Sequence, residues 1–260
     1  MPRLHAVLLS AFLIPAFALA QEVAEPELAT RLINLPTHLT IGSGTMQVIF
    51  THRFSETISD AGGYDLLGLD SPADVGLGFG IGVGKRFEIE LYRSSFFKEF
   101  EGSAKWTLVR QGSTFPLGVA VRAGADYRGA HGVDERWSGF AQVVLARRFG
   151  ATLDLFLVPM FASDTPTLTN AANVAAGAAL HLSRGWDVEA EVIAENRDAR
   201  RGQLAWAVAV NKRLRGHAFA LYLGNSRATT TDLLVGSDYP SSFKKGDVRI
   251  GFNLLRRFPE

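Results

Sequence analysis

The sequence predicts an all-β protein, an antiparallel up-and-down transmembrane β-barrel of about twelve strands. Three observations predict this fold. An export signal stands at the amino terminus, segments of about ten residues alternate apolar side chains with polar or small ones, and tight turns alternate with long loops between these segments. Together they indicate a secreted bacterial protein of the cell outer membrane.

Residues 1–20 are predicted to be a cleaved signal peptide. Arg3 and His5 precede an apolar run over residues 6–20, and Ala18-Leu19-Ala20 supplies the small-residue cleavage pattern. The run is too short to remain as a membrane-spanning helix. The chain has no cysteine, which excludes a lipid-modified cysteine and a disulfide framework.

Residues 21–44 are predicted to be a periplasmic segment or a plug, followed by the barrel over residues 45–260. The stretch 31–37 contains a proline and shows no alternation, so it does not fit a strand of the barrel. The glycine-lined face of residues 76–84 would leave room for a plug inside the lumen.

The clearest strand is residues 75–84, which read V-G-L-G-F-G-I-G-V-G. Apolar side chains fall on one face and glycines on the other, because successive residues of a strand point to opposite sides. Its length suits a tilted strand that crosses the hydrocarbon core.

The same alternation recurs along the chain, less regularly in the first and sixth segments. The predicted strands are residues 45–54, 74–84, 86–95, 98–109, 116–127, 137–148, 151–161, 173–183, 185–196, 202–213, 216–224 and 246–257. Pro159 removes one ladder hydrogen bond, which predicts either a bulge or an earlier end of the seventh strand.

The connections give an independent test of the topology. Tight turns follow the even-numbered strands, whereas the long connections follow odd-numbered ones, at residues 55–73, 128–136, 162–172 and 225–245. This order predicts an even number of strands and places both termini and the short turns on the periplasmic side.

A soluble sandwich or a lipocalin-like barrel also alternates, but three features oppose it. About twelve strands enclose a lumen too wide for Val, Leu and Ala side chains to fill, and the segments exceed the usual strand length. Aromatic residues also gather near strand ends, as in the two interfacial girdles of membrane barrels: Phe87, Trp106 and Trp186 near tight turns, and Phe97, Phe100, Tyr127 and Trp137 near long loops.

Four stretches carry a family resemblance, densest over residues 31–110. They are Ile33-Asn34-Leu35-Pro36-Thr37, Thr51-His52-Arg53-Phe54, Gly68-Leu69-Asp70-Ser71 and Leu91-Tyr92-Arg93-Ser94-Ser95-Phe96. The chain resembles an uncharacterised family of bacterial outer-membrane β-barrel proteins, a domain of unknown function. The resemblance implies the fold and the location, but no activity, ligand or catalytic residue.

If the apolar faces meet lipid, the opposite faces line the lumen and carry charges of both signs. The candidate lumen-lining residues are Glu88, Glu90, Lys105, Arg122, Asp187, Glu189, Glu191 and Arg249. Hairpin register predicts three directly opposed pairs, namely Glu88 with Lys105, Ser103 with Arg122, and His181 with Asp187.

Two interpretations of this wall stay open. The first is a closed lumen crosslinked by salt bridges. The second is an open pore in which the acidic residues 187–195 face Lys105 and Arg122 and set a transverse field on passing solutes. The Ala- and Gly-rich lumen faces at 175–179, 205–209 and 218–220 favour open space.

The sequence predicts no enzyme, metal site or cofactor. His181-Leu182-Ser183 has the spacing of a barrel phospholipase site, in which a histidine activates a serine, but it lies at a tight turn and on the lumen face. The six histidines show no metal-ligand spacing. Residues 76–84 lack the Lys-Ser/Thr ending of a phosphate-binding loop.

A formal net charge of +1 predicts neither a nucleic-acid partner nor a polybasic patch for anionic lipid. The leading functional hypothesis is a porin-like channel for small polar solutes. The alternatives are a non-conducting structural or surface-interaction barrel and, third, a barrel enzyme. The expected partners are outer-membrane lipid, the barrel assembly machinery and periplasmic chaperones during biogenesis, and small polar solutes.

Overall fold

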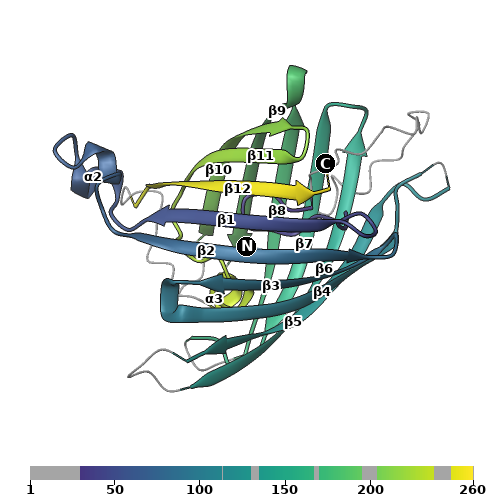
Figure 1. The fold of residues 1–260 in the computed structure, drawn as a ribbon, viewed down its shortest axis with the longest axis horizontal. Helices are drawn as coiled ribbons and strands as arrows, with labels where there is room; N and C mark the ends of the chain where they lie inside the picture. The colour runs from purple at the N-terminus through teal and green to yellow at the C-terminus, as the bar shows by residue number, and fades with distance from the viewer. Residues whose placement is uncertain are drawn as a thin grey trace.

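The computed structural model describes residues 30–112, 114–129, 135–166, 170–194, 204–236 and 247–259. Twelve strands form one closed barrel, in which each strand pairs with its neighbours in sequence and β12 pairs with β1 (Figure 1). The strands are β1 (Met46–Phe54), β2 (Ala73–Val83), β3 (Phe87–Ser94), β4 (Glu99–Val109), β5 (Gly118–Arg128), β6 (Arg136–Phe149), β7 (Leu153–Ala162), β8 (Ala171–His181), β9 (Trp186–Ala194), β10 (Leu204–Leu214), β11 (His217–Gly224) and β12 (Arg249–Phe258). The predicted fold class is confirmed, and each predicted strand lies within a few residues of an observed one.

Pro159 interrupts the ladder between β6 and β7 without changing its register. Gln142 of β6 pairs with Met160, just after the proline. Leu145 pairs with Leu157, just before it, in the same register. The predicted bulge and the predicted early strand end are therefore both wrong, because a proline costs its own ladder hydrogen bond but leaves the neighbouring residues free to pair.

The two ends of the barrel differ in their connections. At the short-turn end, turns over residues 84–86, 110–117, 150–152, 182–185 and 215–216 join the strands. At the long-loop end, the β1–β2 loop contains α2 (Ile58–Ala61) and the 3-10 turn η1 (Leu66–Gly68), which project beyond the strands (Figure 1). Among the described residues, no helix is long and apolar enough to cross a membrane.

The outer face of the barrel is apolar. On β2, Leu77, Phe79, Ile81 and Val83 are 43–53% exposed, while the glycines between them face inward. Aromatic side chains are exposed near both ends of the strands, with Trp106 at the short-turn end and Phe100 and Trp137 at the long-loop end. This surface matches an apolar band between two aromatic girdles.

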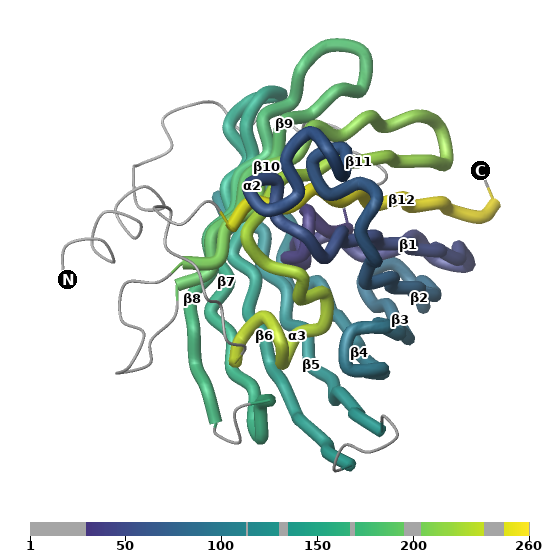
Figure 2. Tube along the Cα trace, turned by 90° about the vertical axis from the view of Figure 1, so that its left-hand side faces the viewer, coloured from purple at the N-terminus to yellow at the C-terminus, as the bar shows by residue number. Residues whose placement is uncertain are grey.

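The lumen is filled by two segments of the same chain. Residues 30–41, called the lumen segment here, precede β1 and are buried almost throughout. The helix α3 (Thr231–Gly236) belongs to the β11–β12 loop, and all of its residues are buried. Figure 2 shows α3 inside the ring of strands, where it contacts β6, β7 and β8. The core of the molecule thus lies in the lumen.

Candidate functional site

The lumen segment folds back on itself in a tight turn. Arg31 and Pro36 form an isolated antiparallel bridge, the Leu32 N–H donates to the Leu35 carbonyl at 2.9 Å, and the Thr37 N–H donates to the Thr30 carbonyl at 3.1 Å. Each bond satisfies a buried backbone group, so the turn can enter the lumen without leaving these donors unpaired.

Small residues of the wall make room for the lumen segment. Ile33 packs against Ala207, Ala209 and Ala220. A Cβ on Gly177 would lie 2.4 Å from Leu32 Cδ1, so a larger residue would collide there. The Ala- and Gly-rich faces that favoured open space are therefore contact surfaces, and that interpretation is corrected. Sequence alternation shows that a wall is small, but not what lies against it.

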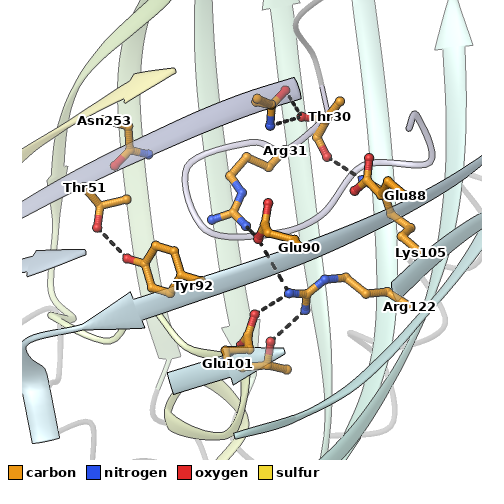
Figure 3. A network of polar contacts seen from close by, with 12 residues as sticks. Thr30, Arg31, Thr51, Glu88, Glu90, Tyr92, Glu101, Lys105, Arg122 and Asn253 are labelled. Carbon is orange, nitrogen blue, oxygen red and sulfur yellow. Dashed lines mark hydrogen bonds and ion pairs between the residues drawn. The ribbon is translucent and has the colours of Figure 1, made fainter. Parts of the chain in front are cut away.

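The predicted pairing of Glu88 with Lys105 is confirmed. They are cross-strand neighbours on β3 and β4, and the Lys105 Nζ lies 2.9 Å from the Glu88 carboxylate. Both also bind the lumen segment, because Lys105 donates to the Thr30 carbonyl at 2.9 Å and Glu88 accepts from the Ile41 N–H at 2.6 Å. Figure 3 shows this cluster between the wall and the segment.

Arg31 of the lumen segment joins the charged wall. Its guanidinium lies 2.6 Å from a carboxylate oxygen of Glu90, and the same oxygen lies 4.0 Å from Arg122 (Figure 3). Arg122 also donates to the Gln142 side chain at 2.9 Å and pairs closely with Glu101. Glu90 and Arg122 therefore belong to one continuous ion-pair network.

Glu191 on β9 holds the tip of the lumen segment. Its carboxylate accepts hydrogen bonds from the Asn34 N–H at 3.0 Å, the Leu35 N–H at 3.1 Å and the Asn34 side chain at 2.5 Å. Across the lumen, Arg53 donates to the Asn34 side-chain oxygen at 3.1 Å and stacks 4.2 Å from the centre of the Tyr222 ring. The tip is thereby fixed from two sides of the barrel.

Asp187 and Glu189 lie nearer the short-turn end. His181 pairs with Asp187 across β8 and β9, as predicted, with its Nδ1 at 2.7 Å from the carboxylate. Its Nε2 lies 2.9 Å from Asp154. Both ring nitrogens are therefore held by carboxylates, which leaves neither available to activate Ser183. Glu189 accepts from the Asn211 side chain at 2.8 Å.

One sequence expectation, the pairing of Ser103 with Arg122, needs correction. Ser103 pairs with Gly124, and Lys105 pairs with Arg122, because the β4–β5 turn is two residues out of the assumed register. Arg249 faces inward but lies at the long-loop end, where its Nε donates to the Ser55 carbonyl at 3.1 Å. Five of the other seven candidate residues contact the segments that fill the lumen: Glu88, Glu90, Lys105 and Glu191 bind the lumen segment, and Arg122 binds Thr231 of α3.

The amino-terminal end of α3 meets an acidic cluster, defined as Glu99, Glu101, Asp126 and Asp232. The Thr231 N–H donates to Glu101 at 2.6 Å, and the Asp232 N–H donates to Asp126 at 3.2 Å. Arg128 lies 2.9 Å from Glu99 and 3.1 Å from Asp232. Burial raises the pKa of Asp232, which lies outside the spanning strands, to about 6, although Arg128 acts in the opposite direction.

The sequence reasoning missed this cluster and the cations that bind it. Glu99 and Glu101 share the inward parity of Lys105 on β4, and Asp126 and Arg128 share that of Arg122 on β5. Extending the alternation to the strand ends would have found all four. No comparable signal existed for Asp232, because the loop that contains α3 has no strand periodicity.

Two small cavities lie between the segments and the wall, among the described residues. One cavity of about 10 Å³ is lined by Asn34, Glu191 and Leu234 among others. A second of about 10 Å³ is lined by Arg31, Glu88 and neighbouring residues. Each has about the volume needed for one water molecule, so the lumen is closed to solutes at these places.

A family of membrane-bound barrels matches most of the chain. The family model described as "Membrane bound beta barrel domain (DUF5777)" matches residues 28–258. The comparison with curated proteins finds no match. Among solved structures, outer membrane phospholipase A from Escherichia coli is 10% identical with a TM-score of 0.47, over 82% of this chain and 89% of that one. A porin mutant from Rh. blastica is 14% identical with a TM-score of 0.36, over 71% and 55% of the two chains.

Proposed function

The chain belongs to this family of membrane-bound β-barrel domains of unknown function, and we propose that it is an outer-membrane barrel closed by two of its own segments. In this proposal the protein does not conduct and is not an enzyme. It acts as a structural or surface-interaction barrel, with the short-turn end in the periplasm. The filled lumen is the observation that supports it.

The contacts inside the lumen favour a stable closure over a loosely placed plug. The lumen segment contributes buried Leu32, Ile33 and Leu35, and it is tied to the wall by charge-assisted bonds to Glu88 and Glu191. Buried bonds of this kind are about twice as strong as neutral ones. Opening a passage would break them and expose the apolar side chains to water.

The long-loop end offers a surface suited to interaction. In the β1–β2 loop, Tyr64 is 94% exposed, and Leu66 and Leu67 are 57% and 47% exposed. Both leucines have left-handed backbone angles, with φ of 48° and 60°, a conformation that is unfavourable for side chains of this kind. A strained turn that presents apolar side chains to water is typical of a recognition surface.

A porin-like channel for small polar solutes is the second candidate, and one observation favours it. Four carboxylates of the acidic cluster face two guanidiniums, Arg122 and Arg128. When all four carboxylates are ionised, their excess negative charge weakens the binding of α3 inside the lumen. In this candidate, a channel would open when α3 or the lumen segment left the lumen.

A planar-bilayer recording of the purified, refolded protein tests the closed barrel. We expect no conductance steps from the intact protein, and steps from a variant that lacks residues 21–44. If that variant does not fold, the triple substitution Leu32→Ser, Ile33→Ser and Leu35→Ser in the full chain replaces it. Steady conductance from intact, folded protein would overturn the proposal and favour the channel.

A further inference from the structure

Positive charges gather at the short-turn end, although the whole chain has a formal net charge of only +1. Four of its five turns and the end of the last strand contribute cations to one belt, called the basic belt here. Its members are Arg86, Arg110, Arg184, Lys212, Arg215 and Arg256, all exposed except Lys212, which is half-buried. The strands next to these residues lie at separate positions around the closed barrel, so the belt extends over much of its circumference.

The turns of this end supply no countercharge to the belt. The five turns of this end contain no Asp or Glu. The carboxylates on the strands nearest these turns are buried in the lumen and have cationic partners. Glu88 pairs with Lys105, and Asp154 and Asp187 pair with Arg148, His181 and Arg213. At the other end, the loop over residues 55–72 contains four acidic residues and no Lys or Arg. The turns of the short-turn end and the β1–β2 loop at the other end therefore carry opposite net charges.

The cations of the belt adjoin the apolar outer surface. Lys212 Nζ lies 4.9 Å from the centre of the exposed Trp186 ring, and Arg256 lies 4.5 Å from that of Phe258. On the same outward faces, Val210 and Leu254 are 49% and 42% exposed. An alkyl stem can thus lie along the apolar band while its charge reaches the level of the lipid headgroups.

The hydrogen bonds of two turn cations, Arg86 and Arg110, leave most of their donors available. Arg86 donates to the Leu108 carbonyl at 3.3 Å, and Arg110 donates to the Lys85 carbonyl at 3.2 Å. A guanidinium has five N–H donors, so each of these bonds occupies a small part of the group. Both are bonds to neutral acceptors, which do not compensate the positive charge.

We infer that the basic belt binds the phosphate groups of anionic phospholipids in the leaflet at the short-turn end. The inference rests on the proposed membrane barrel, and adds a lipid class and a place on the molecule to it. Phosphate suits these side chains because guanidinium groups bind its oxygens in pairs. Each cation near an anionic membrane surface gains attraction that falls off within a Debye length.

Unfolding in lipid vesicles tests the belt. The protein is refolded into vesicles of phosphatidylcholine alone and of equal parts phosphatidylcholine and phosphatidylglycerol, and the folding equilibrium constant is measured with urea at low and high salt. We expect the anionic vesicles to raise the constant of the intact protein by about tenfold or more at low salt, and by much less at high salt. The triple variant Arg86→Gln, Arg110→Gln and Arg184→Gln should lose most of this gain.

A matched triple variant at the long-loop end, Arg93→Gln, Lys98→Gln and Arg136→Gln, should keep the gain. Because each gain compares one variant in two lipids, an intrinsic loss of stability cancels.

An equal gain in both triple variants, or none in the intact protein, would overturn the inference about the belt without contradicting the closed barrel. Failure to insert into either vesicle would overturn both proposals. A gain from soluble polyphosphate as large as that from the anionic vesicles would indicate a polyanion site in water and also overturn the inference.

Discussion

At the scale of the residue, the lumen is stable because its buried charges have partners. Lys105 is 2% exposed and lies between the Glu88 carboxylate and the Thr30 carbonyl. A charge removed from water costs several kcal/mol unless a partner and hydrogen bonds compensate it. Removing one partner is therefore more damaging than removing both.

The substitution Lys105→Met tests this balance. The substitution removes the cation that pairs with the buried Glu88 carboxylate. We therefore expect a loss of about 3–5 kcal/mol in the free energy of unfolding. The double variant Lys105→Met with Glu88→Gln should recover part of that loss, because the uncompensated charge is gone. Urea unfolding of the three proteins in the same detergent measures both effects. A double variant less stable than Lys105→Met alone would contradict the argument.

Residue pairs were predictable only where a hairpin sets their register. Glu88 with Lys105 and His181 with Asp187 each lie on adjacent strands joined by a short connection. Glu191 binds Asn34 across 157 positions of the sequence, and nothing in a strand pattern relates two such segments. The strand pattern placed the candidate residues on inward faces, but it did not give the lumen-segment partners of Glu88, Lys105 and Glu191.

At the scale of the element, the wall and the lumen segment are shaped to each other. Gly82 of β2 has no side chain because the segment leaves the lumen there. A Cβ at this position would lie 2.0 Å from the Gly42 carbonyl oxygen and 2.4 Å from that of Ile41. Alternation predicted β2 and its glycine face, but the backbone that passes over that face came only from the tertiary structure.

The substitution Gly82→Ala should displace the end of the lumen segment. We expect a loss of about 1–3 kcal/mol in stability, typical of an overpacked site, measured by urea unfolding. Gly102→Ala on β4 is the matched control, because its Cβ would only touch Leu91 at 3.6 Å. If both variants lost the same stability, a general strand effect would replace the steric explanation.

The docking of α3 should weaken as pH rises. Burial raises the pKa of Asp232 from 3.8 to about 6 when α3 is docked. The negative charge of Glu101 also raises this pKa, whereas Arg128 and the hydrogen bond with Glu99 lower it. The docked state therefore holds the proton more tightly, so docking is fully favoured below pH 3.8 and loses strength through about pH 6, by up to about 3 kcal/mol.

Hydrogen-exchange protection factors of the Leu234 amide, which donates to Thr230 at 3.0 Å, measure this docking. Protection factors correct for the intrinsic effect of pH on exchange. We expect them to fall between about pH 4 and pH 6 in the intact protein and to vary less in Asp232→Asn. Protection that is constant over this range, or equally variable in Asp232→Asn, would exclude Asp232 as the titrating group.

At the scale of the whole molecule, the barrel and its filling form one core. The lumen segment packs its leucines against alanines of the wall, and α3 joins the same cluster through Leu233 and Val235. A barrel of this size has too wide a lumen to be filled by its own wall. The sequence predicted the wide barrel but left a filled lumen and an open pore as alternatives, because alternation does not show what lies against the inner face.

Because filling and wall share a core, they should unfold in one transition. All four tryptophans lie on strands, at positions 106, 137, 186 and 206, so their fluorescence reports the barrel. The chain has no cysteine, so a dye on Thr40→Cys reports the lumen segment alone. We expect both probes to give the same urea midpoint, as in two-state unfolding.

Glu191→Ala removes three hydrogen bonds from the tip of the segment, and should move the dye transition to lower urea than the tryptophan transition. Separate midpoints in the intact protein would instead describe a plug that leaves a standing barrel, which is the behaviour of a gated channel.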